Sequence, residues 1–458
     1  MKKKIAIIVT FMLLLSAVSY ATPPEITAAS AILINAETQE VLFELNATTP
    51  LPPASTTKVM TALLILENHS LDEIVDVGPN FVDPGEKKIA INHNEIFTVE
   101  ELLYAVIVES ANDASAALAV FHSGSVEAFA EAMNERAKEL GAVDSNFVNP
   151  HGLDEPGHLS TAKDLAIISA EAMKNATFRL LVSTQRYTIN PTNMQPKARD
   201  YLFTSNFFIR DTNKTMIYRG QKVKIYDERI DGIKTGYTTK AGNCLISTLS
   251  SGGNRYISVV LGAGADNLVY VDSRGLLDYA SEDFKRLRVV SEGDVVTNIT
   301  VPGAENTGLN LISQDSITRT VPVDFDESTI EESFDLYDLP EEPIKTGMEM
   351  GSLSLSIGGE VIATTKLLAQ NDIETGDLIG SLSEKLSSKP FESPYDYLVF
   401  AIKLLIAIAI WRWIIVGRRR RTKKRIREEK LAQIREEIQT QDESSNVYKL
   451  SDKRRNRT

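Results

Sequence analysis

The spacing of apolar residues predicts a mixed α and β domain at residues 22–284. Apolar and polar residues alternate along AILINAETQEVLFELN (31–46), which indicates two strands joined at Glu37-Thr38. Helical spacing of apolar residues follows in four segments, 56–68, 98–121, 126–141 and 160–174. The pattern becomes strand-like after residue 220, and segment 265–284 closes with a helix. This order lets both ends of the domain build one antiparallel sheet with helices packed on its faces.

A small all-β domain is predicted next, at residues 285–378, where short alternating strands are separated by turn residues. A polar linker follows at 379–395. The apolar segment 397–416 has 20 residues and is long enough to span a membrane, so we predict a transmembrane helix at 396–416. Apolar residues run all round the helix that this segment would form, rather than along one stripe, which favours a spanning helix over an interfacial one. The basic tail, 417–458, then lies in the cytoplasm by the positive-inside rule.

The N-terminus has the pattern of a secretory signal peptide at residues 1–21. Three lysines precede a 14-residue apolar run, which is short for a spanning helix, and small residues predict cleavage after Ala21. The whole chain carries −13; the tail contributes +8 (15 Lys and Arg, 7 Asp and Glu) and the signal +3, which leaves −24 for residues 22–416. An acidic exterior argues against nucleic acid as a partner. We expect a single-pass protein of the cell membrane with its main domains on the extracytoplasmic side.

Ser55 and Lys58 are the first candidates for chemistry. Residues three apart at the start of a helix share one face, with Cβ atoms ~5–6 Å apart. A serine becomes a good nucleophile when a neighbour takes its proton, and a lysine can do so only when burial or a nearby positive charge keeps it neutral. The same spacing recurs at Ser160–Lys163, where Thr161 and Asp164 predict a capping box instead. Four letters alone leave the choice open.

Ser110 and Asn112 form a second short motif within a mostly apolar helical region. Polar residues in such a region need a partner or a function. They indicate either part of a site or a turn between two helices that these side chains cap. A second Ser-x-Asn, at Ser444–Asn446, lies in the predicted cytoplasmic tail.

Lys-Thr-Gly occurs twice. In the first copy Lys234 lies on a predicted strand, where it can bind a carboxylate; Thr235 can add a hydroxyl bond, and Gly236 lets backbone approach a ligand. The second copy begins at Lys345 in the all-β domain and is read as a turn, with Gly347 at a position that needs φ > 0.

The order Ser55-x-x-Lys58, Ser110-x-Asn112, Lys234-Thr-Gly236 within one domain resembles the low-molecular-mass penicillin-binding proteins of the serine D-alanyl-D-alanine carboxypeptidase family, peptidase S11. STTK, SAND, IDGIKTGYTTKAGNCL and NPHGLDEPGHLSTAKDLA carry the resemblance, which covers roughly residues 25–375. It implies an α/β (α+β) domain like that of serine β-lactamases and transpeptidases. The family is usually tethered by an amphipathic helix, so the predicted spanning helix is a departure.

The resemblance also implies a role for each residue. Ser55 attacks the carbonyl of the penultimate D-Ala, Lys58 takes its proton, and Ser110 relays protons as the third catalytic residue. The backbone N–H groups of Ser55 and Tyr237 form the oxyanion hole. The substrate-binding residues are Asn112, Lys234, Thr235, Gly236 and Tyr237. Peptidoglycan stem peptides and β-lactams are the expected ligands, and no metal or cofactor is needed.

Alternatives from other classes stay open on the sequence. A class A β-lactamase shares the three motifs, but no convincing E-x-x-L-N segment lies between Ser110 and Lys234. A D,D-endopeptidase acting on cross-links or a non-catalytic wall-binding scaffold also fits. The single cysteine, Cys244, excludes an internal disulfide and is expected to be a buried core residue.

Overall fold

The computed structural model describes residues 23–210, 212–302, 308–340 and 343–373. The predicted signal peptide, linker, transmembrane helix and tail lie outside these ranges. Within them, no helix combines the length and apolar character needed to cross a bilayer. Ser444–Asn446 also lies outside.

A five-stranded antiparallel sheet forms the centre of the first domain, in the order β2-β1-β11-β10-β9. Its strands come from both ends of the domain, as predicted, and they are β1 (Ser30–Asn35), β2 (Val41–Leu45), β9 (Ile230–Thr238), β10 (Gly242–Ser251) and β11 (Asn254–Ala263). Every residue of β1 is buried, because the sheet is covered on both faces. Strand β9 lies at one edge of the sheet in this order, and it carries the first Lys-Thr-Gly.

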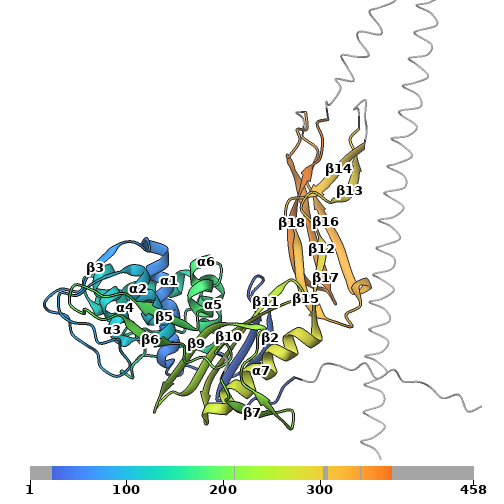
Figure 1. The fold of residues 1–458 in the computed structure, drawn as a ribbon. Helices are drawn as coiled ribbons and strands as arrows, with labels where there is room; N and C mark the ends of the chain where they lie inside the picture. The colour runs from blue at the N-terminus through green and yellow to red at the C-terminus, as the bar shows by residue number, and fades with distance from the viewer. Residues whose placement is uncertain (1–22, 211, 303–307, 341–342, 374–458) are drawn as a thin grey trace, which may run out of the picture. The chain divides into compact units, whose positions relative to one another are not determined.

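Helices cover the two faces unequally (Figure 1). Six helices lie in the larger layer, α1 (Lys58–Asn68), α2 (Val99–Tyr104), α3 (Asn112–Ser123), α4 (Val126–Glu139), α5 (Ala162–Ala172) and α6 (Ala176–Ser183). Their buried side chains join Ile32, Ile246 and Val259 of the sheet in one core. The long helix α7 (Asp266–Asp283) packs on the opposite face over a second core that includes Leu33 and Val260. Alternating residues of each strand thus serve two cores.

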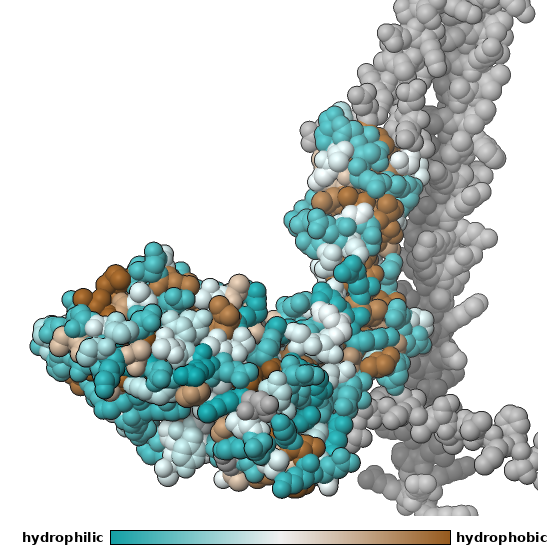
Figure 2. All heavy atoms as spheres, in the orientation of Figure 1, coloured by the Kyte–Doolittle hydropathy of each residue, from teal (hydrophilic) through white to brown (hydrophobic). Residues whose placement is uncertain are grey.

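Three two-stranded antiparallel sheets complete the domain: β3 (Ile74–Asp76) with β4 (Ile96–Thr98), β5 (Arg186–Ile189) with β6 (Arg199–Phe203), and β7 (Thr215–Tyr218) with β8 (Gln221–Lys224). Hydrophilic residues cover most of the face seen in Figure 2, with apolar residues in small patches.

The segment 98–121 is helical as predicted, but it is interrupted. The chain makes α2, a π-helical turn (Ala105–Glu109), and then a break at Ser110, whose φ of +65° is left-handed, before α3 begins. The alternative, a turn between helices, describes the backbone correctly, but neither Ser110 nor Asn112 caps α3. Both side chains are therefore available for contacts outside the helix.

The capping box predicted at Thr161 is half right. The Thr161 side chain accepts a hydrogen bond from the Asp164 N–H at 3.0 Å, so α5 has its N-cap. The Asp164 carboxylate instead accepts bonds from the Asp144 N–H and the Ser145 hydroxyl, both at 2.8 Å. Ser160, the matching serine of the second Ser-x-x-Lys, is bonded to Ser145. This copy is a structural one, because its polar atoms hold α5 to the preceding loop.

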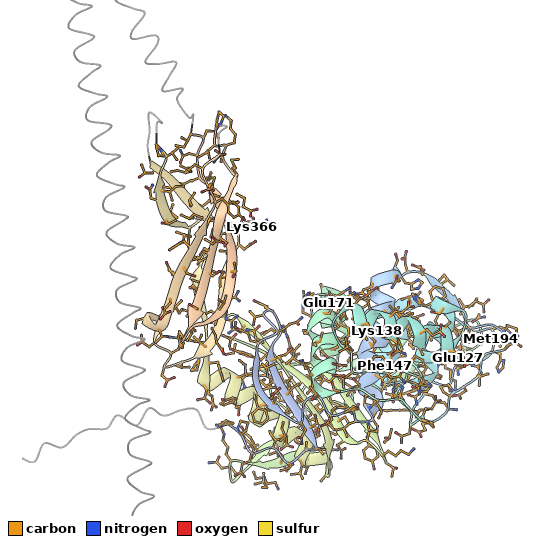
Figure 3. The ribbon with its side chains drawn as sticks, turned by 180° about the vertical axis from the view of Figure 1, so that it is seen from behind. Glu127, Lys138, Phe147, Glu171, Met194 and Lys366 are labelled. Carbon is orange, nitrogen blue, oxygen red and sulfur yellow. The ribbon has the colours of Figure 1, made fainter. Side chains whose placement is uncertain are left out.

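The second domain is all β, as predicted. A five-stranded sheet has the order β13-β14-β18-β17-β16, and β12 pairs with β15. The strands are β12 (Phe284–Val290), β13 (Val295–Thr300), β14 (Gly308–Ser313), β15 (Ile317–Pro322), β16 (Ile330–Leu336), β17 (Glu349–Ile357) and β18 (Glu360–Ala369). Leu353, Leu355 and Leu367 are fully buried, whereas Lys366 between them in the ladder is exposed and pairs with Glu349 (Figure 3). This alternation is the period-2 pattern read in the sequence.

Candidate active site

A tight turn places Ser55 directly before α1. Residues Ala54–Thr57 form a 3₁₀ turn that runs into the helix at Lys58. The Lys58 Nζ lies 3.0 Å from the Ser55 Oγ, so the expected proximity of hydroxyl and amine is present. Gly152 packs against this turn, with φ +88°, and a Cβ added there would lie 1.9 Å from the Ala54 carbonyl oxygen. Glycine is required at that position because the two backbones touch.

Three contacts orient the Lys58 amine, which is fully buried. Its Nζ lies 2.7 Å from Asn112 Oδ1 and 2.5 Å from the His151 carbonyl oxygen. The Asn112 Nδ2 donates to the Gly85 carbonyl at 3.1 Å, which fixes the amide so that Oδ1 faces Lys58. Both of these Lys58 partners can only accept. A neutral amine has two N–H groups and one lone pair, so the lone pair is left for the Ser55 hydroxyl proton.

The surroundings favour this neutral form. Burial is the largest cause that lowers the pKa of Lys58 well below its usual value, and the positive charges of Lys234 and Lys87 lower it further. The carboxylates of Asp113 and Glu86 oppose the shift. The net direction is the one that a general base at neutral pH requires.

Ser110 and Lys234 meet on the other side of the site. The Lys234 Nζ donates to the Ser110 Oγ at 2.9 Å and to the Thr235 carbonyl at 3.0 Å. Burial, followed by the charge of Lys87, lowers the pKa of Lys234 to about 7, although Glu109 opposes the shift. A second buried lysine, whose pKa lies near neutral pH, is thus poised to become charged when an anion binds.

Strand β9 approaches the Ser55 turn closely. A Cβ on Gly236 would lie 3.0 Å from the Ser55 N and 3.1 Å from the Pro53 carbonyl oxygen. Glycine at this position therefore lets the strand lie against the turn. The Thr235 hydroxyl lies 2.6 Å from the Ser205 hydroxyl. Tyr237, which follows Gly236 on the strand, is 64% exposed.

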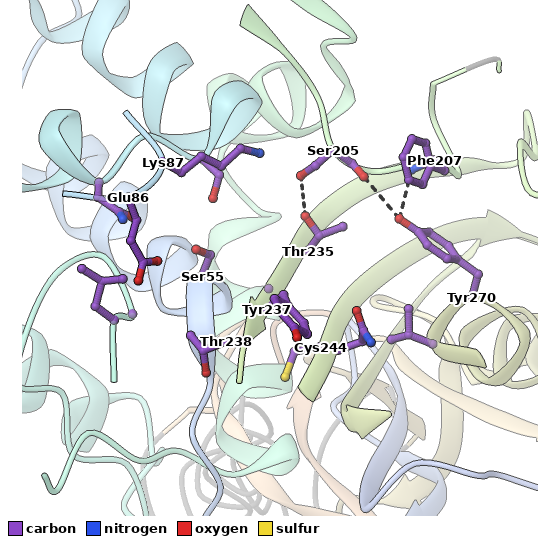
Figure 4. Close-up of a pocket in the computed structure, with 17 residues that line it drawn as sticks. Ser55, Glu86, Lys87, Ser205, Phe207, Thr235, Tyr237, Thr238, Cys244 and Tyr270 are labelled. Carbon is purple, nitrogen blue, oxygen red and sulfur yellow. Dashed lines mark hydrogen bonds between the residues drawn. The ribbon is translucent and has the colours of Figure 1, made fainter. Parts of the chain in front are cut away.

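These residues line one cavity of about 320 Å³ (Figure 4). Its wall includes six of the predicted site positions, Ser55, Ser110, Asn112, Thr235, Gly236 and Tyr237. Lys58 and Lys234 lie behind this wall, bonded to Ser55 and Ser110. The fold thus brings together all eight residues from three separate stretches of chain. Lys345 of the second Lys-Thr-Gly is not in the lining; it begins a turn in which Gly347 has φ +82°.

Several residues of the wall were not found from the sequence. Glu86, Lys87, Ser205, Phe207 and Tyr270 belong to no motif, and they reach the cavity only through the fold. The Tyr270 hydroxyl accepts from the Phe207 N–H at 3.2 Å and lies 3.3 Å from the Ser205 carbonyl, which holds this loop in place. Cys244 is buried as predicted and also lies along the cavity; burial raises the pKa of its thiol to about 11.

The fold is that of a penicillin-binding protein, with a helical and antiparallel-sheet domain followed by an all-β domain. Residues 17–265 match the family described as D-alanyl-D-alanine carboxypeptidase, peptidase S11. Residues 284–375 match the C-terminal domain of penicillin-binding protein 5. The chain belongs to the D-alanyl-D-alanine carboxypeptidases of peptidase family S11, which are serine enzymes.

Proteins of similar sequence match most of the chain. The D-alanyl-D-alanine carboxypeptidase DacF of Bacillus subtilis is 31% identical over 367 residues, which cover 78% of this chain and 89% of DacF. DacC of Escherichia coli is 28% identical and covers 78% and 87%. Among solved structures, penicillin binding protein 5 from Haemophilus influenzae has a TM-score of 0.62 at 28% identity, covering 77% of this chain and 99% of that one.

Proposed function

We propose that this chain removes the terminal D-Ala from peptidoglycan stem peptides through an acyl-enzyme on Ser55, outside the cytoplasmic membrane. The contact between the Ser55 Oγ and the Lys58 Nζ carries this proposal, because the other two partners of the amine can only accept hydrogen bonds. A lone pair directed at a serine hydroxyl is the arrangement that a general base needs.

In the acylation step, the Ser55 oxygen bonds to the carbonyl carbon of the penultimate D-Ala while its proton moves to the Lys58 Nζ. The carbonyl oxygen becomes an oxyanion, which the N–H groups of Ser55 and Tyr237 are proposed to bind. The C–N bond then breaks. Terminal D-Ala leaves as an amine that takes a proton through Ser110, and water later attacks the ester and restores the Ser55 hydroxyl.

Lys234 and Thr235 are proposed to bind the terminal carboxylate of the substrate. The ligand-free pKa of Lys234 is about 7, and an adjacent carboxylate raises the pKa of an amine. Binding of the substrate therefore charges Lys234 at the moment when its charge is useful. A positive Lys234 also disfavours a second positive charge on Lys58, so the same event helps keep the proposed base neutral. Asn112 is proposed to hold the peptide amide.

We also propose that residues 396–416 anchor the enzyme as a single transmembrane helix, with residues 417–458 in the cytoplasm. Support comes from the 20 apolar residues at 397–416 and the basic run that follows at once. The catalytic domain would then face the cell wall, where the stem peptides are. β-Lactams, whose ring carbonyl replaces the scissile one, are expected to acylate Ser55 covalently.

Two measurements test the proposal. A fluorescent penicillin should label the purified protein, and Ser55→Ala should abolish the labelling; labelling that persists in this variant would refute Ser55 as the nucleophile. Mass analysis of a pentapeptide substrate should show loss of one D-Ala. Cleavage confined to cross-linked peptides would indicate an endopeptidase, and no change in either substrate would indicate a binding scaffold.

A further inference from the structure

A second cavity lies beside the helical layer of the first domain. Its volume is about 560 Å³, which is usual for a small-molecule site, and its lining shares no residue with that of the Ser55 cavity. Its walls come from the chain after β3, from α3 and from the start of α4, which lie together in Figure 1. The apolar residues of the lining include Val77, Pro79, Phe81, Val82, Val120 and Val126. Such walls suit an apolar molecule.

Two of these apolar side chains are accessible to solvent. Val82 and Val120 are both exposed, whereas Val77 and Ala116 of the same two walls are buried. Single exposed apolar residues are common on protein surfaces. Two that come from separate elements and line one cavity form a surface that gains free energy when an apolar molecule covers it.

His151, also in the lining, has an unused hydrogen-bond donor. Its side chain is 6% exposed, and its Nδ1 accepts a hydrogen bond from the Leu153 N–H at 3.3 Å. Burial lowers the pKa of His151 to about 3, so the ring is neutral at neutral pH and carries its one proton on Nε2. Among the residues that the structure describes, none accepts a hydrogen bond from this N–H.

The unused N–H of His151 faces the cavity. The Nε2 atom is not among the sealed polar atoms that lack a partner in the described chain, so it reaches accessible surface. The surface that His151 lines is this cavity. An unpaired donor in apolar surroundings is unfavourable, so a ligand with a hydrogen-bond acceptor should bind better than one without.

The charge around the cavity selects against anions. Glu127 is the one acidic or basic residue among the described residues of the lining, apart from the neutral His151, and it is exposed. The exported part of the chain carries −24. A carboxylate would be repelled by this charge, and it would lose its hydration for a single neutral N–H. A neutral acceptor, such as a carbonyl oxygen, avoids both costs.

We propose that this cavity binds a neutral, mainly apolar molecule that carries one hydrogen-bond acceptor, and that the His151 Nε2–H donates to that acceptor. This site goes beyond the proposed function and does not depend on it. It lies directly behind the proposed base, because the His151 carbonyl accepts from the Lys58 Nζ. Ala116 in the wall lies one helical turn after Asn112, the other acceptor of that amine. A bound molecule would therefore contact both segments that orient Lys58 without entering the Ser55 cavity.

Three probes of nearly the same shape test this site. Acetophenone has a carbonyl oxygen, α-methylstyrene has a methylene group in its place, and benzoate has a charged carboxylate. Ligand-observed NMR with the purified protein measures the dissociation constant of each probe. Acetophenone should bind about three- to tenfold more tightly than α-methylstyrene, which is the effect of one neutral hydrogen bond. Benzoate should bind more weakly than either.

Three variants locate the binding. Val120→Trp fills the cavity from α3 and should weaken acetophenone binding by about tenfold or more. Val143→Trp makes the same change at another exposed valine that is not in the lining, and it should preserve binding. His151→Phe keeps a ring but lacks the donor, so the preference for acetophenone over α-methylstyrene should disappear.

Several results would overturn the site. Acetophenone could bind no better than α-methylstyrene, Val143→Trp could lose as much affinity as Val120→Trp, or His151→Phe could keep the preference. Loss of acetophenone binding after benzylpenicillin has acylated the protein would place the probe in the Ser55 cavity and would also overturn the site. Failure of the protein to take up penicillin would overturn the proposed function alone, because the two cavities share no lining residue.

Discussion

Lys234 is a buried lysine, and we expect the burial of its amine to lower the free energy of unfolding by a measurable amount. Its side chain is 2% exposed, and its pKa is lowered from 10.5 to about 7. Each pKa unit corresponds to ~1.4 kcal/mol, so at pH 6 the buried ammonium destabilises the folded state by roughly 5 kcal/mol. Lys234→Met removes this cost with a side chain of similar length.

The substitution also has a cost. The Ser110 Oγ and the Thr235 carbonyl lose their lysine donor. Ser110 lines the cavity, where water can replace that donor, so the cost is that of one unsatisfied buried polar group, ~1–3 kcal/mol. The two effects oppose each other, and the burial of charge is the larger. We therefore expect Lys234→Met to raise the free energy of unfolding at pH 6 by roughly 2–4 kcal/mol, while it abolishes turnover.

The pH dependence separates this cause from others. Between pH 7 and 10.5 the unfolded state binds the Lys234 proton and the folded state does not, so stability from this group rises with pH. Below pH 7 both states bind it and the cost is constant. The advantage of Lys234→Met should therefore shrink as pH rises from 7 toward 10.

Urea unfolding of the purified protein, followed by circular dichroism at pH 6, 8 and 10, measures this difference. Lys345→Met is the matched control, because Lys345 lies in an exposed turn and such changes stay within ~0.5 kcal/mol. The reasoning is refuted if Lys234→Met is no more stable than the unmodified protein at pH 6, or if its advantage is the same at pH 10.

Two further predictions each compare the same substitution at two residues of the same type that lie in different surroundings. Lys234→Ala should slow penicillin acylation and D-Ala release by ~100-fold or more, because the substrate loses a charged contact. Lys345→Ala should change neither rate. Equal losses in both variants would contradict the choice between the two Lys-Thr-Gly copies. Gly152→Ala should abolish penicillin labelling, because the new Cβ would overlap the Ala54 carbonyl. Gly157 also has positive φ, but a Cβ there would meet only Asn146 at 3.5 Å, so Gly157→Ala should retain labelling. Labelling of Gly152→Ala at the normal rate would show that the close contact with Ala54 is dispensable.

Local periodicity predicted the elements that hold the site, since apolar spacing reflects which face of a helix or strand is buried. It placed Ser55 and Lys58 on one helical turn, because residues three apart on a helix are neighbours whatever surrounds them. It failed between α2 and α3. Apolar residues continue through the π-helical turn before Ser110, so the pattern gives no sign of the break, which contacts from other elements stabilise.

Long-range contacts of the site could not be read from the chain. The bond between Lys234 and Ser110 joins residues 124 positions apart, and the loop of Glu86 and Lys87 reaches the cavity through backbone carbonyls that any residue could supply. Backbone partners leave no signature in residue identity. This is why the motifs were found and the residues around them were not.

The sequence by itself determined the order of the reactive groups, the two-domain plan and the identity of the hydroxyls, amines and amide that form the site. The order of the motifs already favoured the first of the two Lys-Thr-Gly copies, whereas the tertiary structure decided in which direction the pKa values of the buried lysines shift. The lone pair of Lys58 faces Ser55 because Asn112 and His151 occupy its other two directions. Burial, charge proximity and hydrogen-bond direction depend on positions in space, and the fold alone sets those.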